Sequence, residues 1–302
     1  MADVYSIKKS TLDAIGNAIR TQEGSTEKIP VDELAERILA IETGGVTAST
    51  TAKSGVTYTE GIADLDAATI HMIARAISDN SDITKETMSV YVDYGANHRK
   101  ISVGDQVAVS MYNYDYALDV LGFNHDTLTN AYEYEGATTA TGLAGMSLQM
   151  HNTLPNPFNM NVDASGTGSS NTGGWKNASG RDDLLYIKDK LPDDWRVIVK
   201  PVNKKAGTGG GSTSGTVTVS DELFLLSEAE VFGSTTYSVT GEGSQYAYYK
   251  EGNPAKKNSP WWLRSPRSGN STDFCAVNDS GNVETVVSAS YGSHQIAFAF
   301  CV

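Results

Sequence analysis

The stretch Trp261-Trp262-Leu263-Arg264-Ser265-Pro266 concentrates the residues that are best able to organise a core. Tryptophan is large and flat, and its indole N–H needs an acceptor when it is buried. The guanidinium of Arg264 carries its donors in a rigid fork, so it can satisfy several backbone carbonyls at once in a fold with few regular elements. We therefore predict that Trp175, Trp261, Trp262 and Arg264 form the structural scaffold of the domain, and we assign no catalytic residue.

The chain around this stretch has the pattern of short strands separated by long loops. Apolar and polar residues alternate over 90–94, and the run over 117–123 is mostly apolar. We expect the Gly/Ser/Thr-rich stretches 163–174 and 203–215 to be exposed loops, with a helix over 182–190 between them. Short strands, long loops and few helices predict an α+β fold.

The amino-terminal part has a different character. Two helix signatures lie within residues 1–45, with apolar stripes over 12–19 and 31–41. Two short helices do not make a domain, so these stripes must pack on each other, on another copy of the chain or on a larger body. Residues 46–54 have the small-residue composition of a linker, and a third helix is predicted over 64–78.

The charge excludes several classes of partner. The formal net charge is −13 and the pI is about 4.8, which disfavours binding to nucleic acid or to anionic lipid. No apolar run approaches the roughly 20 residues that a membrane span needs, and the start lacks the layout of a signal peptide. The two cysteines, Cys275 and Cys301, are expected to be small core residues, and a disulfide between them is left open.

Several motifs stand in order along the chain. They are Phe123-Asn124-His125-Asp126, Gly173-Gly174-Trp175-Lys176-Asn177 with Arg181, Leu223 to Glu228, Trp261 to Pro266, and Ile296 to Val302. Together they resemble a C-type-lectin-like family that is common in phages and prophages of gut bacteria. The resemblance runs from about Tyr91 to residue 302 and implies a C-type-lectin-like domain over 89–302.

Residues 27–34 resemble the opening segment of phage tail and baseplate proteins. This likeness implies a helical tail-attachment segment over 1–45, followed by a linker and helix over 46–88.

The segment between Pro266 and Ile296 is rich in small polar residues and has no Lys, Leu, Ile, Met or Trp. Interleaved apolar residues such as Phe274 and Val287 would face inward, leaving the polar positions to face solvent. This composition resembles the variable region of proteins diversified by retroelements, and it is also the composition that antibody loops use. The resemblance implies that the ligand-binding surface comprises Arg267, Ser268, Asn270, Ser271, Thr272, Asp273, Asn278, Ser280, Asn282, Glu284, Thr285, Ser288, Ser290, Tyr291, Ser293 and His294.

The resemblance implies a receptor-binding protein, or adhesin, in a virion tail, with no enzymatic activity and no cofactor. Its expected partners are a host cell-surface protein or glycan, other tail or baseplate proteins and further copies of itself, with a trimer as the first expectation. Avidity would strengthen weak single contacts. A surface that never varies, or a purely structural tail component, remains an alternative.

Two further alternatives depend on particular residues. A formylglycine-generating-enzyme-like oxidoreductase would need Cys275 and Cys301 as neighbours in an accessible groove. A calcium-dependent lectin would need a calcium tripeptide, which is absent, although Asp273 and Asp279 could supply oxygen ligands. The adjacent pair His125-Asp126 is interpreted as structural, because neighbouring residues on a strand point to opposite faces.

Overall fold

The computed structural model describes residues 45–129, 139–162, 169–292 and 294–302. The described residues form four β-sheets with a few short helices, which confirms a mixed α+β, mostly β, fold class. The two expected amino-terminal helices, and residues 163–168 of the first expected loop, lie outside the described residues. None of the helices in the described ranges has the length and apolar character needed to cross a membrane.

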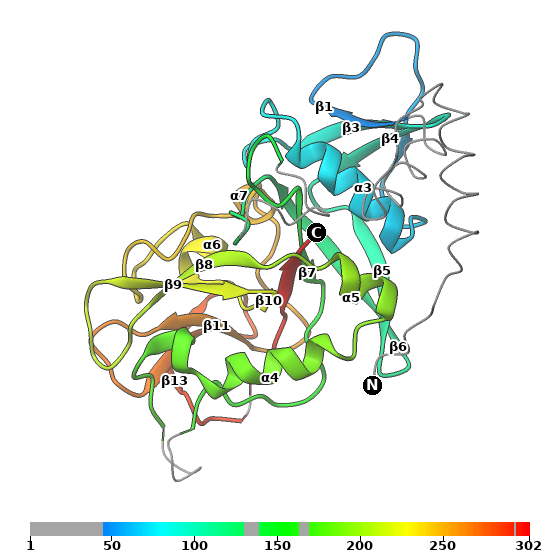
Figure 1. Ribbon diagram of the computed structural model, residues 1–302. Coiled ribbons are helices and arrows are strands. Elements are labelled where there is room, and N and C mark those ends of the chain that lie inside the picture. Colours follow the sequence, from blue (N-terminus) through cyan, green and yellow to red (C-terminus); the bar gives the residue numbers. More distant parts are fainter. Residues whose placement is uncertain (1–44, 130–138, 163–168, 293) are drawn as a thin grey trace, which may run out of the picture.

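The first sheet lies at the top of Figure 1 and has the strand order β1-β3-β4-β2. The expectation of a linker over 46–54 is wrong for its first half, because Val46–Ser49 pairs antiparallel with Ser89–Tyr94. The boundary expected between residues 88 and 89 therefore falls within one sheet. The strands are β1 Val46–Ser49, β2 Thr59–Glu60, β3 Ser89–Tyr94 and β4 Asn97–Ser102.

Helix α3, Ala67–Ser78, packs beside this sheet and ties it to the rest of the molecule. It begins after Asp66, whose carboxylate accepts a hydrogen bond from the Thr69 N–H at 2.7 Å, as an N-cap does. Its buried face includes Ile70, Ile73 and Ile77. The helix predicted over 64–78 is thus confirmed, and the cap explains why it begins at residue 67.

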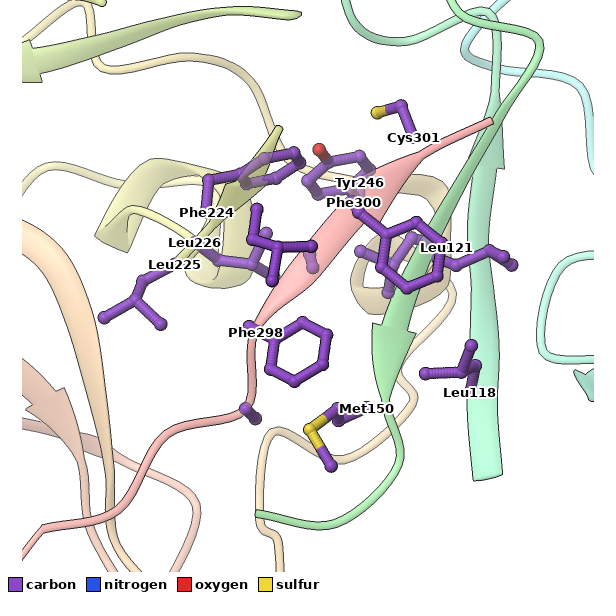
Figure 2. Close-up of a cluster of buried hydrophobic side chains, with 14 of the residues drawn as sticks. Leu118, Leu121, Met150, Phe224, Leu225, Leu226, Tyr246, Phe298, Phe300 and Cys301 are labelled. Carbon is purple, nitrogen blue, oxygen red and sulfur yellow. The ribbon is translucent and has the colours of Figure 1, made fainter. Parts of the chain in front are cut away.

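The five-stranded sheet forms the centre of the molecule, with the order β10-β14-β7-β6-β5. The runs predicted as strands over 90–94 and 117–123 are confirmed as β3 and part of β6. Strand β14, near the carboxyl end of the chain, pairs with β10 on one side and β7 on the other. Its Phe300 lies among buried apolar side chains (Figure 2). The strands are β5 Gln106–Met111, β6 Tyr114–Phe123, β7 Met146–Met150, β10 Leu223–Phe224 and β14 Ala299–Cys301.

The region over 174–221 is more regular than its composition suggested. The predicted loop 203–215 is wrong at its start, because residues 202–207 form β8, which pairs with β9 in a two-stranded sheet. Alternate residues of β8 are buried, so tertiary packing overrides the weak strand propensity of its lysines and glycine. The helix predicted over 182–190 is confirmed as α4, although it begins earlier. The elements are the 3₁₀ helix η2 Gly174–Asn177, α4 Ser179–Lys188, α5 Asp193–Ile198, β8 Val202–Gly207 and β9 Thr216–Asp221.

The three-stranded antiparallel sheet β11-β12-β13 carries the segment expected to bind a ligand and lies at the lower left of Figure 1. Every residue of β11 and β12 is buried, so the sheet is covered on both faces and only its ends and its β13 edge reach solvent. The remaining elements are α6 Glu228–Phe232, α7 Ala247–Lys250, β11 Trp261–Pro266, β12 Asp273–Val277 and β13 Val283–Ser288.

Candidate ligand-binding surface

The tryptophans beneath the surface are fully buried and satisfied. The indole N–H of Trp175 donates to Asp221 Oδ2 at 2.8 Å, that of Trp261 to the Ala255 carbonyl at 2.9 Å, and that of Trp262 to the Phe158 carbonyl at 2.7 Å. The bonds of Trp175 and Trp262 join residues 46 and 104 positions apart in the sequence, and the bond of Trp261 anchors a nearby loop. These contacts agree with the structural role predicted for the tryptophans.

Arg264 connects strands and loops through every nitrogen of its guanidinium. It donates to the carbonyls of Lys205, Leu225 and Glu242 at 3.1, 2.8 and 2.8 Å, and it forms a bidentate pair with Glu230 at 2.5 and 2.8 Å. Burial opposes the charge of Glu230, but Arg264 and Lys204 outweigh it and hold the pKa of this carboxyl below its usual value. The expectation that Arg264 satisfies several carbonyls agrees with this geometry.

A second buried charge pair continues this network. Lys204 Nζ lies 2.6 Å from Asp126 Oδ1 and 2.7 Å from Glu230 Oε1, and it also lies 4.1 Å from the centroid of the Phe224 ring. Burial would raise the pKa of Asp126, but Lys204 and His125 keep it well below its usual value. The network is shielded from water and its charges are paired, which is the arrangement that a buried charge requires.

The interpretation of His125-Asp126 as two residues on opposite faces of a strand is wrong. Strand β6 ends at Phe123, and Asn124 takes a left-handed conformation with φ +43°, so strand alternation does not apply beyond it. His125 Nδ1 lies 3.4 Å from Asp126 Oδ1, and the His125 ring stacks on Tyr246 at 3.9 Å between centroids. Both side chains are almost completely buried within the charge network, which supports a structural role.

The two cysteines lie in different sheets, Cys275 on β12 and Cys301 on β14. Both are free and buried, which agrees with the prediction that they are core residues. Burial raises the pKa of both thiols well above the usual value, so the reactive thiolate form is disfavoured. The accessible groove that the oxidoreductase alternative requires does not surround either side chain in the described residues.

One group of predicted ligand-binding residues gathers at the end of the sheet where β11 turns into β12. We call it the loop end. Ser271 and Thr272 are exposed, and the Ala289 N–H donates to the Thr272 carbonyl, which places the end of β13 alongside this loop. Tyr291, which follows, is 56% exposed. The loop end comprises Arg267, Ser268, Asn270, Ser271, Thr272, Ser288, Ser290 and Tyr291.

Asn270 and Asp273 shape the loop end. The Asn270 side-chain oxygen accepts hydrogen bonds from the Thr272 and Asp273 N–H groups at 2.7 and 2.8 Å. Asp273 is 7% exposed and accepts hydrogen bonds from Arg267, Asn270 and Thr272. The expectation that Asp273 faces a ligand is therefore wrong, because its carboxylate is turned inward to hold the loop.

The second group lies where β12 turns into β13, and we call it the hairpin end. Asn278 Oδ1 accepts from the N–H groups of Ser280 and Asn282 at 2.9 and 3.1 Å, and both of those residues are exposed. The length of β12 separates this end from the loop end by roughly 16 Å at about 3.3 Å per residue. The predicted surface therefore divides into two patches. The hairpin end comprises Asn278, Ser280, Asn282 and Glu284.

His294 does not face solvent as predicted. It is 5% exposed, its ring lies 5.0 Å from that of Trp262, and its Nε2 lies 3.1 Å from Glu284 Oε2. Aromatic packing against a buried tryptophan explains why this polar residue is covered. Ser293 lies outside the described residues, and for Thr285 only the backbone of β13 is described.

A pocket of about 520 Å³ lies beside α4, outside the surface predicted from the sequence. Tyrosines from the turn between β5 and β6 and from α4 line it, together with the loop over 154–158. These residues were not among those predicted from the sequence. The signal that could have indicated part of this pocket is the tyrosine at every second position over 112–116, because strand alternation places such residues on one face.

The described residues contain no group of three or more His, Cys, Asp and Glu side chains that could hold a metal ion. The oxygens of Asp273, one of the two candidate calcium ligands, are engaged by Arg267, Asn270 and Thr272. Asp279, the other, is exposed at the hairpin end.

Comparison with protein families finds a match for the carboxyl-terminal part of the chain. A family model described as a domain of unknown function (DUF6273) matches residues 167–302, which include the three-stranded sheet, both of its ends and all the scaffold residues. No curated protein and no solved structure matches the chain.

Proposed function

We propose that this chain is a receptor-binding protein of a phage or prophage tail and that it holds a host-surface protein or glycan through the loop end and the hairpin end. We further propose that its carboxyl-terminal part is a C-type-lectin-like domain whose exposed positions vary. The observation that supports this proposal most strongly is the exposure of small polar residues and a tyrosine at the ends of a sheet whose strands β11 and β12 are wholly buried.

The separation of roles within the surface supports this proposal. Ser271, Thr272 and Tyr291 are exposed, and their replacement should leave the core intact, since surface substitutions usually change stability by about 0.5 kcal/mol or less. Asn270 and Asp273 instead hold the turn. The contact positions are therefore the exposed members of each end, and the turn-forming residues support them.

Attachment by full-length protein tests the proposal. We expect labelled wild-type chain to bind cells of at least one strain in a panel of gut bacteria. A Ser271→Ala/Thr272→Ala/Tyr291→Ala variant should bind that strain at least about tenfold more weakly, a loss of about 1.4 kcal/mol. A Thr51→Ala/Ser54→Ala variant, changed at exposed positions that follow β1, is the matched control and should bind like wild type.

The proposal fails if no strain retains the wild-type chain, or if the triple variant binds as well as wild type. A structural tail component would give the second result while still entering particles. Thermal unfolding of both variants establishes that any loss of binding does not come from loss of the fold.

A further inference from the structure

The turn that joins β5 to β6 places a bulky residue where glycine or asparagine is favoured. Met111 pairs with Tyr114 across the hairpin, so Tyr112 and Asn113 form a two-residue turn, with φ +52° and +64°. Both values lie in the left-handed region that such hairpin turns require, and Asn-Gly is the usual choice there. A tyrosine in this conformation is strained, and strain of this kind gathers at functional sites.

The strained tyrosine forms one edge of the 520 Å³ pocket. Tyr114 and Tyr116 follow it at alternate positions of β6, so they share one face of the strand. Tyr186 lines the pocket from α4 and is 62% exposed, while Tyr114 is 68% exposed. Large aromatic side chains this exposed, drawn from separate elements around one hollow, are typical of a binding site.

The charge of the pocket restricts its ligand. Asp183 is the only Asp or Glu among the described residues that line the pocket, and no Lys, Arg or His lines it. Burial and the neighbouring Asp182 already raise the pKa of Asp183, and the carboxylates of both residues would repel a negatively charged ligand. An anionic ligand therefore does not fit. A cation is also disfavoured at Tyr186, because Lys190 Nζ already lies 4.4 Å from the centroid of that ring.

A neutral ligand with both apolar faces and hydroxyl groups matches these walls. Tyrosine rings offer flat apolar surfaces to the C–H faces of a sugar, and their hydroxyls both donate and accept hydrogen bonds. The Asp183 carboxylate and the Asn156 amide add further hydrogen-bonding groups at the same hollow. The pocket volume lies within the range of small-ligand sites and exceeds what a single methylated ammonium group would fill.

We propose that this tyrosine-lined pocket is a second binding site, separate from the loop end and the hairpin end, and that it takes a neutral carbohydrate. Its wall over 154–158 is hydrogen-bonded to residues 294–296, which lie between the loop end and β14. The Leu154 N–H donates to the Ile296 carbonyl at 2.9 Å, and the Phe158 N–H donates to the His294 carbonyl at 2.8 Å. The two sites are thus neighbours with different chemistry.

A neutral-glycan array probed with the full chain, followed by calorimetric titration of the glycan that it retains, tests the site. Tyr112→Asn should raise the midpoint of thermal unfolding by about 2–4 °C, because asparagine tolerates the left-handed turn. It should also weaken glycan binding at least about tenfold. Tyr114→Ala should weaken binding to a similar extent, whereas Tyr237→Ala, which removes another exposed tyrosine outside the pocket, should not.

A rise in the unfolding midpoint together with a loss of affinity is a result that a merely structural Tyr112 would not give. The proposal is overturned if no neutral glycan is retained, if both pocket variants bind as wild type does, or if proline-rich or methyl-lysine peptides bind in the pocket and glycans do not. It is also overturned if the Ser271→Ala/Thr272→Ala/Tyr291→Ala variant abolishes glycan binding while the pocket variants retain it. That result would instead support the proposed receptor surface.

Discussion

Replacing Arg264 with methionine should severely destabilise the protein, because it removes a positive charge from the middle of a buried network. The guanidinium is completely buried, and its removal leaves Glu230 with Lys204 as its remaining cationic partner. Breaking a buried ion pair by removing one member costs about 3–5 kcal/mol. The carbonyls of Lys205, Leu225 and Glu242 also lose a donor, and a buried acceptor left unsatisfied costs about 1–3 kcal/mol.

These losses share one network and do not add, so we expect Arg264→Met to lower the free energy of unfolding by at least about 4 kcal/mol. That is a large share of the roughly 5–15 kcal/mol by which a native protein is stable. Urea unfolding followed by tryptophan fluorescence measures the change, and a variant without a cooperative transition would meet the expectation.

Arg267→Met is the matched control, since it removes the same group three positions further on. The Arg267 side chain is 35% exposed and its Nη1 lies 3.3 Å from Asp273 Oδ2, so its removal should cost about 0–1 kcal/mol. Equal costs for the two variants, or a cost below about 1 kcal/mol for Arg264→Met, would refute the reasoning that the buried network holds β11 in place.

Three further changes test other parts of the structure. Burial lowers the pKa of Lys257 to about 8, so above that pH the unfolded chain binds more protons than the folded protein and the free energy of unfolding rises with pH. In urea unfolding, the free energy of unfolding of wild type should gain about 2 kcal/mol relative to that of Lys257→Met between pH 7.5 and 9.5. A difference that stays constant over this range would contradict the prediction. Gly145→Ala should prevent stable folding, because the added Cβ would lie 1.8 Å from the Ala74 carbonyl oxygen. In the control Gly122→Ala the added Cβ meets only ordinary van der Waals contacts, so this variant should fold. Circular dichroism of the two variants measures the difference. Asn270→Ala should lower the unfolding midpoint in urea through a loss of about 1–2 kcal/mol, because it removes the acceptor that shapes the loop end; an unchanged midpoint would show that the turn does not depend on it.

The parts of the fold that the sequence could predict are those with strong local or chemical signals. Alternation of apolar and polar residues predicted β3, and an apolar run predicted much of β6. The polar composition of the segment after Pro266 predicted exposed residues there, and Ser271 and Tyr291 are exposed. The role of Arg264 followed from its donors alone, because a buried guanidinium must find acceptors wherever it lies. These inferences needed no knowledge of distant contacts.

The errors arose where distant contacts decide the outcome. Asp273 and His294 look like their exposed neighbours in sequence, but their burial depends on Arg267 and Trp262, whose positions the sequence does not give. Strand β8 forms because β9 pairs with it, although its composition resembles a loop. The tyrosine pocket requires α4 to meet the β5–β6 turn, and no spacing along the chain indicates that meeting.

The position of β14 between β10 and β7 has a consequence for the kinetics of folding. Strands β5, β6 and β7 can pair as soon as they have been synthesised, but β7 then presents an open edge until residues 299–301 arrive. An unpaired edge is a template for other chains, and pairing across such a long intervening segment is slow. Newly made chains should therefore pass through an aggregation-prone intermediate. Chaperones that cover the open edge of β7 in this intermediate would raise the yield of native protein.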